Sequence, residues 1–304
     1  MTPKEYLQKF QELDVFLFSS ENPASFQDGN WVRTSVSSYR LGVSYDPAKN
    51  PLPPPGPDGN VGPRKIVHPY QDDLTSAVKG HTKIKVKVKR IDGVVETGEF
   101  EYADLAYGLV APFSGKGYPE EVQLLLQERY RFQKTKIELE QFVKQQFIGL
   151  DCNGFVGGYL ERRNAQTSWR RTKASMTSMP IRSILGPDHT FLKSWDDFRA
   201  PGPEPLLLGL CTKDGTVLDH TDDGGVGHIA ITEPGTLKKE SGQGPVKVDV
   251  AEATGDGVGL TYSEYQILSM TLDSRKRGIF YVHRDSKRGK PHEYEYFRIA
   301  PVRV

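Results

Sequence analysis

The sequence predicts an α+β protein, with helices in its first half and an antiparallel sheet in its last third. Apolar side chains recur at helical spacing over residues 3 to 13 and 119 to 147, whereas the apolar runs after residue 204 are short and separated by Gly, Pro and Asp turns. Helices followed by strands favour separate layers of each kind. The chain has 304 residues and 37% apolar content, enough for one large domain or two ordinary ones.

Residues 1 to 115 predict an N-terminal extension or small module. Residues 3 to 13 suit a short helix, with Pro3 in its first turn. The run DPAKNPLPPPGPDGNVGP, residues 46 to 63, predicts a loop because proline lacks an amide donor and fixes φ. Lysines alternate with apolar residues within residues 82 to 105, up to an Asp-Gly pair that is typical of a β-hairpin.

The expected register of this hairpin is the one that places glutamates opposite the lysine row. A two-residue turn places Lys89 opposite Glu96. We expect a glycine bulge at Gly98, because one extra residue there moves Glu99 and Glu101 onto the lysine face. The lysine row then faces water and glutamates, which makes a nucleic-acid stripe the less favoured interpretation.

Residues 116 to 304 predict a second, larger domain. Residues 119 to 147 are helical in pattern, with a break expected near Thr135. The Arg- and Ser-rich stretch from 162 to 180, which contains Trp169, is expected to be a surface loop or lid. Strands are expected at 205 to 212, 227 to 233, 246 to 253, 278 to 284 and 294 to 304.

The stretch IGLDCNGFVGGYLE, residues 148 to 161, places Cys152 where a helix should begin. Asp151 is a typical capping residue, and apolar residues follow at helical spacing. Unpaired amides and the helix dipole stabilise negative charge at such an end, which favours a thiolate. The alternative is an ordinary buried thiol, which is how we interpret Cys211 in its apolar strand. Both cysteines are expected to be unpaired.

A thiolate nucleophile needs a neighbouring imidazole, and His228 is the best placed of the seven histidines. The run GGVGHIAITE puts it at the first residue of a strand, beside glycines that let a substrate approach. Glu252, on the next predicted strand, could accept a hydrogen bond from the other ring nitrogen. Asp249 is the alternate, although it lies on the opposite face of that strand.

His220 is the second candidate for the base. With the neighbouring Asp219, Asp222 and Asp223 it also resembles a loose cation site, but a solvated acidic loop is favoured because no regular ligand spacing is present. Neither a metal nor a cofactor is expected.

The order of these blocks resembles that of NlpC-type papain-like cysteine peptidases. The resemblance covers about residues 120 to 304 and rests on four blocks in the same order. LDCNGFV resembles the family's Asp-Cys-Ser-Gly-Phe/Leu-Val, and PEPLLLGL resembles its Pro-Gly-Asp-Leu-Leu. GHIAITE resembles Gly-His-Val-Gly-Ile, and VAEATGDGVGL resembles the block in which a polar residue is followed by Ala. The resemblance implies a papain-like fold whose helices pack on an antiparallel sheet. It also implies Cys152 as nucleophile, His228 as base and Glu252 in the third position.

Two further residues follow from this resemblance. Asn153 stands where the family usually has Ser, and Glu252 where it usually has His, Asn or Gln. Gln146, six positions before Cys152, has the offset of the oxyanion-hole glutamine in papain-like enzymes. Gln146 and Asn153 are therefore expected near the oxyanion or the substrate.

These residues predict a cysteine hydrolase that cleaves an amide or peptide bond through a thioester. The resemblance implies bacterial peptidoglycan stem peptides as a substrate class. Two alternatives stay open: an acyltransferase or transamidase that uses the same site, and a non-catalytic binding or structural protein on the same scaffold.

Composition limits the partners and the location. Forty basic and thirty-nine acidic residues give a net charge of +1, so no global field attracts nucleic acid or an anionic membrane. Charged residues interrupt the N-terminal stretch where a signal peptide needs an apolar run, and no run of about 18 apolar residues occurs. We expect a cytoplasmic chain without a membrane span; export by a route other than Sec would leave no mark in the sequence.

Overall fold

The computed structural model describes residues 1–19, 27–39, 83–132, 138–145, 148–163, 168–170, 176–185, 191–199, 204–219, 227–235, 238–239, 245–255, 259–287, 290 and 293–302. The helices are α1 (Pro3–Gln11), α3 (Tyr102–Val110), α4 (Pro119–Phe132), α5 (Leu139–Gln145), α6 (Cys152–Arg162), α7 (Ile181–Ile184) and α8 (Trp195–Arg199), with short 3-10 turns η1 (Ala111–Ser114), η2 (Met176–Ser178) and η3 (Asp285–Lys287). The strands are β1 (Leu13–Phe18), β2 (Gly29–Thr34), β3 (Ser38–Tyr39), β4 (Lys83–Lys89), β5 (Val95–Glu101), β6 (Gly149–Leu150), β7 (Leu206–Cys211), β8 (Ile229–Thr232), β9 (Lys238–Lys239), β10 (Val246–Thr254), β11 (Gly259–Leu272), β12 (Gly278–Arg284) and β13 (Tyr294–Pro301).

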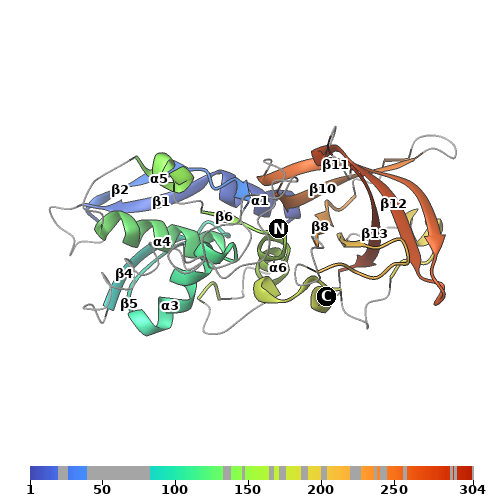
Figure 1. Cartoon of the computed structure of the whole chain (residues 1–304). Helices are drawn as coiled ribbons and strands as arrows, with labels where there is room; N and C mark the ends of the chain where they lie inside the picture. Colours follow the sequence, from blue (N-terminus) through green and yellow to red (C-terminus); the bar gives the residue numbers. More distant parts are fainter. Residues whose placement is uncertain are drawn as a thin grey trace, which may run out of the picture.

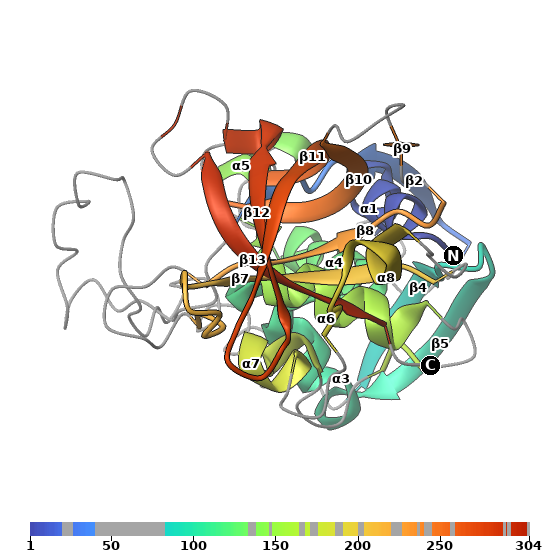
Figure 2. The ribbon, with the colours of Figure 1, turned by 90° about the vertical axis from the view of Figure 1, so that its right-hand side faces the viewer.

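The molecule has two parts, with α6 between them (Figure 1). One part contains α3, α4, α5 and the paired strands β1–β2 and β4–β5. The other contains β7, β8 and β10 to β13, which face the viewer in Figure 2. This mixture of helices and antiparallel strands confirms the predicted α+β class.

Helix α1 confirms the helix predicted at the N-terminus, although it ends at Gln11. Its start is a capping box, in which the Thr2 side chain accepts from the Glu5 amide and the Glu5 carboxylate accepts from the Thr2 amide. Tyr6 and Phe10 are completely buried on its inner face. The chain then enters β1, which pairs antiparallel with β2 and was not predicted.

Strands β4 and β5 form the predicted hairpin, but with a different turn. Lys89 lies opposite Val95, not Glu96, and the register runs past Gly98 without a bulge. The extra residue lies in the turn, where Gly93 has a φ of +86°. A three-residue loop with glycine in the left-handed region thus replaces the expected two-residue turn. The predicted Lys89–Glu96 pairing and the bulge at Gly98 were wrong.

The three-residue loop produces the lysine–glutamate pairing that the bulge at Gly98 was expected to produce. Glu99 lies opposite Lys85, with 3.7 Å between Oε1 and Nζ, and Glu101 lies opposite Lys83 at 4.0 Å. Phe100 is on the other face and packs against the core. Glutamates therefore neutralise part of the lysine row, as expected. The chain then turns into α3 at residues that were predicted to continue the strand.

Helix α4 covers the edge of β4 that does not pair with β5. Gln123 accepts a hydrogen bond from the Lys89 amide (2.8 Å) and donates one to the Lys89 carbonyl oxygen (2.7 Å). Gln127 makes the same two contacts with Lys87. Amide side chains spaced along one helix face thus replace a neighbouring strand and satisfy the edge.

Two other predictions concern segments that are only partly described. The helix predicted over 119 to 147 is present as α4 and α5, and the break expected near Thr135 lies outside the described residues. The proline-rich loop at 46 to 63 also lies outside them.

The C-terminal strands close into a six-stranded antiparallel barrel. The strand order is β11-β12-β13-β7-β8-β10, and β10 also pairs with β11, from Val246 opposite Ile267 to Thr254 opposite Gly259. The short strand β9 extends the edge of β10. The strands predicted in this part are all present as β7, β8, β10, β12 and β13. Strand β11 was not predicted, and it is the strand whose pairing with both β10 and β12 closes the sheet.

The barrel strands bury apolar side chains on both faces. Residues inside the barrel form one cluster, which includes Val250, Tyr265 and Phe297. Alternate residues on the outer face, such as Ala251, join a larger cluster with α1, α6 and the hairpin. This larger cluster contains residues from both sides of position 115, and the division of the chain there stays a prediction. Helix α6 packs against the outside of β8 and β10 (Figure 1). Its first residue, Cys152, contacts the backbone amide of Ile229, where β8 begins.

Candidate active site

Helix α6 begins at Cys152, as the sequence predicts. Asp151 is its N-cap: the backbone is extended (φ −89°, ψ 173°), and Oδ1 accepts a hydrogen bond from the Gly154 amide at 2.6 Å. The same carboxylate is paired with Lys116, whose Nζ lies 2.6 Å from Oδ2. The thiol is therefore held at the positive end of the helix.

Gly154 has a steric role in the Asp-Cys-Asn-Gly sequence. A Cβ atom at this position would lie 1.8 Å from the carbonyl oxygen of Gly115. That same carbonyl accepts a hydrogen bond from the Asp151 amide at 3.2 Å. The first turn of α6 thus packs directly on the backbone that follows η1, and only glycine fits there.

The Cys152 thiol is fully buried, and its surroundings keep it protonated. Burial raises the pKa of Cys152 to about 12, and the negative charge of Asp151 acts in the same direction. The backbone amides of Ile229 and Asn153 and the charge of Lys116 oppose this shift. The helix N-terminus is present as expected, but in this conformation it does not produce the thiolate that its position favours.

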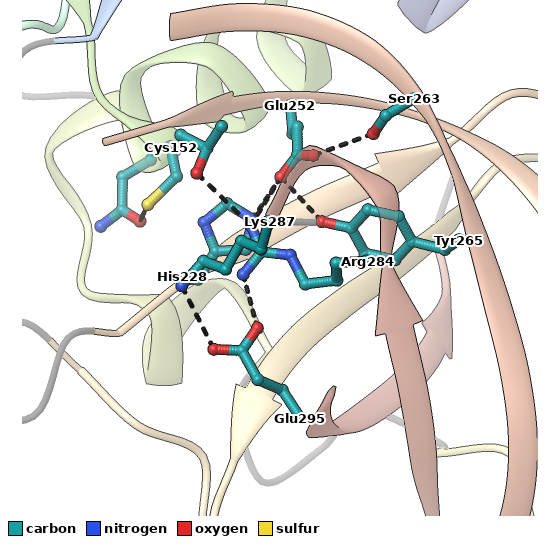
Figure 3. A network of polar contacts seen from close by, with 10 residues as sticks. Cys152, His228, Glu252, Ser263, Tyr265, Arg284, Lys287 and Glu295 are labelled. Atoms are coloured by element: carbon teal, nitrogen blue, oxygen red, sulfur yellow. Dashed lines mark hydrogen bonds and ion pairs between the residues drawn. The ribbon is translucent and has the colours of Figure 1, made fainter. Parts of the chain in front are cut away.

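The hydrogen bond between the Ile229 amide and the Cys152 sulfur places the sulfur next to the start of β8. His228, the preceding residue, is 5% exposed, and Glu252 on β10 is completely buried. The Nε2 atom of His228 lies 2.8 Å from Oε2 of Glu252. Asp249 is on the opposite face of β10, so Glu252 is the acidic residue of this strand that contacts His228. In Figure 3 the Cys152 sulfur lies on the side of the imidazole that faces away from Glu252.

The ionisation of Glu252 determines which ring nitrogen of His228 carries the proton. Burial opposes ionisation, but the charge of Arg284 and the hydrogen bonds from His228 and Tyr265 outweigh it and hold the pKa of Glu252 well below its usual value. An ionised carboxylate only accepts hydrogen bonds, so Nε2 of His228 is the donor. The lone pair of the neutral ring is then on Nδ1, the nitrogen that is left to face the thiol.

The imidazole itself is neutral in the folded chain. Burial lowers the pKa of His228 to about 4, and the nearby positive charge of Arg284 acts in the same direction. The hydrogen bond and the charge of Glu252 oppose the shift without cancelling it. The site therefore contains a neutral thiol and a neutral imidazole, rather than a thiolate and an imidazolium.

Several polar residues around Glu252 were not predicted. The Tyr265 hydroxyl donates to Oε2 at 2.7 Å, the Ser263 hydroxyl to Oε1 at 3.0 Å, and Arg284 Nη2 to Oε2 at 2.9 Å. Arg284 also contacts Glu295 (Figure 3). Tyr265 and Ser263 lie on β11, the strand that the sequence analysis missed. Arg284 carried one signal, a charge at the end of an otherwise apolar strand, but such a charge is usually solvated.

The two residues expected at the oxyanion have different outcomes. The Nδ2 group of Asn153 donates to the Met179 carbonyl oxygen at 2.9 Å, and its Oδ1 lies 3.6 Å from the Cys152 sulfur. In this conformation Asn153 thus ties the start of α6 to the segment after η2. Gln146 lies outside the described residues.

Other candidates lie away from this site or outside the described part of the chain. Trp169, expected in a surface loop, is instead 2% exposed, and its Nε1 donates to Glu96 at 3.0 Å. Cys211 is a buried thiol on β7. His220, with Asp222 and Asp223 of the acidic loop, is outside the described residues.

Comparison with protein-family models, with curated proteins and with solved structures finds no match to this chain. The geometry of the site is thus what bears on function. Within the described ranges there is no cluster of three or more His, Cys, Asp and Glu side chains that could hold a metal ion. None of the described helices combines the length and the apolar character needed to cross a membrane.

One groove lies elsewhere in the molecule. It has a volume of about 430 Å³ and is lined by residues of α1, β1, the hairpin turn and the start of α4. Its lining is strongly charged and does not include Cys152, His228 or Glu252.

Proposed function

We propose that the chain is a papain-like cysteine hydrolase of the NlpC type that cleaves an amide or peptide bond. The observation that carries this proposal is the convergence of three predicted residues from distant parts of the sequence. Cys152 begins a helix, its sulfur reaches the amide that follows His228, and the far nitrogen of His228 is bound to the buried Glu252. The papain-like description is supported by a second feature: the helix that carries the cysteine packs on the barrel that supplies the histidine.

The reaction starts with proton transfer from the thiol to Nδ1 of His228 as the sulfur adds to the substrate carbonyl. The backbone amide of Cys152, at the start of α6, stabilises the oxyanion. The imidazolium then protonates the leaving amine, and a thioester to Cys152 forms. Water, activated by the same imidazole, hydrolyses the thioester and releases the acid and the thiol. Glu252 keeps Nε2 protonated and stabilises the imidazolium during both steps.

The neutral thiol and imidazole make this a general-base mechanism. With the pKa of Cys152 raised to about 12 and that of His228 lowered to about 4, the ion pair is the minor form of the free protein. Proton transfer therefore accompanies attack on the carbonyl. A bound substrate favours this proton transfer, because it excludes water from the site and places its carbonyl dipole beside the sulfur.

The test is turnover by the Cys152→Ala variant, assayed on peptidoglycan stem peptides and on generic amide and activated ester substrates. We expect kcat/KM to fall by at least about 1,000-fold, because the nucleophile is lost while binding is retained. The control is Cys211→Ala, which removes the other buried thiol and should retain full turnover. Equal rates for the chain and its Cys152→Ala variant would remove Cys152 from the mechanism.

The same assay separates hydrolysis from acyl transfer. Added amines compete with water for the thioester, so a transferase yields the amide product at the expense of the free acid. Hydrolysis predicts the acid as the main product at millimolar amine.

A second candidate function is a non-catalytic binding protein on the same scaffold, and the complete burial of the Cys152 thiol favours it. Mass spectrometry after incubation with an activated acyl ester discriminates between the two. An acyl adduct on Cys152 that is absent from Cys152→Ala supports the hydrolase. A folded protein that forms no adduct and turns over none of the substrates supports the binding protein.

A further inference from the structure

We propose that Arg284 is a positioning residue of this site, which fixes Glu252 against His228 and sets the charge balance around the imidazole. This inference rests on the proposed function for its catalytic consequence, but its electrostatic part can be measured without any substrate.

Arg284 lies at the end of β12, with a fully buried guanidinium group. Its Nη2 atom is 2.9 Å from Oε2 of Glu252 and 3.2 Å from Nε2 of His228. Its Nη1 atom is 2.6 Å from Oε2 of Glu295 on β13. One side chain thus donates to the carboxylate of the proposed site and to a second carboxylate across the barrel (Figure 3). Because Nε2 of His228 carries the proton, its 3.2 Å approach to Nη2 is a contact between two donors and not a hydrogen bond.

These contacts leave Glu252 a single orientation. Oε2 accepts from Nε2 of His228 at 2.8 Å, from the Tyr265 hydroxyl at 2.7 Å and from Arg284 at 2.9 Å. Oε1 accepts from Ser263 at 3.0 Å. Rotation of the carboxylate would break several buried hydrogen bonds at once, so the ring nitrogen that it holds stays the same.

The charges around His228 are already balanced without a proton on the ring. Glu252 on β10 and Glu295 on β13 face Arg284 on β12 and Lys287 on η3, whose Nζ is 3.3 Å from Glu295. An imidazolium would add a third positive charge to two positive and two negative ones. In a buried site this surplus is costly, so Arg284 favours the neutral ring.

Among the described residues, those that face the ring from α6 do not supply a compensating charge. There the thiol of Cys152 is neutral, and Asp151 is paired with Lys116 at 2.6 Å. From β11, Ser263 and Tyr265 contribute hydroxyl groups only.

A purely structural role is the alternative. The guanidinium carbon of Arg284 lies 5.5 Å from the centre of the Tyr265 ring and 5.9 Å from that of Phe297, so the side chain also fills the barrel. That role predicts a loss of stability on substitution and no change in the titration of His228.

The experiment compares Arg284→Gln with the full chain by NMR titration of the His228 ring and by the pH profile of Cys152 alkylation with iodoacetamide. Without Arg284, Glu252 has only the imidazole as its cationic partner. We expect the midpoint of the His228 titration to rise by at least about one pH unit. Cys152 alkylation near pH 6.5 should rise about tenfold, because a shift of one unit makes the minor ion-pair form about ten times more populated. Arg284→Lys keeps the charge and should return both readouts toward those of the full chain.

Arg298→Gln is the matched control. Arg298 is 1% exposed on β13, but its guanidinium bonds Asp273 and backbone carbonyls away from His228. Its loss should lower stability and leave the His228 titration unchanged. If Arg284→Gln does not fold, Glu295→Gln replaces it: with less compensation for the Arg284 charge, the His228 midpoint should move to lower pH.

An unmoved His228 titration in a folded Arg284→Gln variant overturns the inference, as does an unmoved midpoint in Glu295→Gln when it replaces that variant. A shifted titration in a chain without turnover on any substrate supports the charge role of Arg284 and counts against the proposed hydrolase, so the two failures can be told apart.

Discussion

The neutral ring of His228 links the stability of the fold to pH. Burial and Arg284 lower the pKa of His228 to about 4 in the folded chain, whereas an exposed histidine titrates near pH 6.5. Between these values the unfolded state binds the proton and the folded state does not. The free energy of unfolding therefore falls as the pH falls through this window, by at most about 3 kcal/mol from this residue. Urea unfolding at pH 7 and pH 5 measures the change.

The His228→Asn variant provides the control for this dependence. It removes the titrating group, so the fall in the free energy of unfolding that His228 contributes between pH 7 and pH 5 is missing from this variant. Burial raises the pKa of Glu128 to about 7, which stabilises the fold as the pH falls over the same range in both proteins, so the difference between the two slopes measures the contribution of His228. Glu252 also has a lowered pKa, but its contribution is lost only as the pH falls below the value of an unfolded carboxyl, about 4.5. The same slope in both proteins over pH 5 to 7 would contradict the assignment to His228.

The sequence identifies only some of the residues that meet at this site. Cys152, His228 and Glu252 could be named because each is a reactive residue type at the start of an element or inside an apolar strand. The role of Arg284 depends on which strands become neighbours. Local sequence reveals neither the burial that raises the pKa of Cys152 nor the partners of Glu252, which lower its pKa against the effect of burial.

The first turn of α6 combines a helix cap with the electrostatics of the thiol. We expect Asp151→Ala to lower the free energy of unfolding by about 1–3 kcal/mol, because it removes the cap and leaves Lys116 without this carboxylate. Asp151→Asn keeps a capping oxygen and should cost less. Both variants should lower the pKa of Cys152, since the charge of Asp151 raises it. Urea unfolding and the pH profile of alkylation provide the two measurements.

Thr2→Ala is the matched cap substitution for this comparison. It removes the exposed capping bond at the start of α1, which is remote in sequence from the thiol. It should cost roughly 1 kcal/mol or less and leave the alkylation profile of Cys152 unchanged. A Cys152 profile that also stays unchanged in both Asp151 variants would show that this carboxylate does not act on the sulfur.

At the level of whole elements, pattern predicts regular segments better than connections. The alternation in β4 and the capping residue of α6 are local signals, and both elements are present. The turn of the β4–β5 hairpin depends on where the extra residue is placed. We predicted Gly98 from the charge pairing, but an extra residue in the turn at Gly93 gives the same pairing. Strand β11 has few consecutive apolar residues and its register shifts between Ile267 and Ser269, so its pattern is weak despite its length.

Closure of the barrel explains why this missing strand matters to the whole molecule. Without β11 the predicted strands form an open sheet, and nothing places Tyr265 and Ser263 around Glu252. With it, β10 has neighbours on both sides and the inner face becomes a closed apolar core with a polar end. The residues at that end are then far from water, which lowers the pKa of His228, whereas the pKa of Glu252 is lowered by Arg284 and its hydrogen bonds against the effect of burial.

The larger core also determines how the chain can be divided. The rings of Tyr6 on α1 and Phe155 on α6 lie 5.7 Å apart, and those of Tyr6 and Tyr159 lie 6.0 Å apart. Leu7 and Phe10 are also at most 2% exposed in this core. Removal of α1 would therefore expose one face of the helix that carries Cys152.

We expect a fragment of residues 116–304 to lose cooperative unfolding when it is produced alone, although this range contains the proposed catalytic residues. Loss of three large apolar side chains from a packed core costs about 2–5 kcal/mol for each, which is comparable with the stability of a whole domain. Circular dichroism during urea unfolding tests this, with the full chain as reference. Adding back a peptide of residues 1–19 should restore part of the transition, because it supplies α1 and β1. A fragment that unfolds cooperatively at the same urea concentration as the full chain would mean that residues 1 to 115 are an independent module.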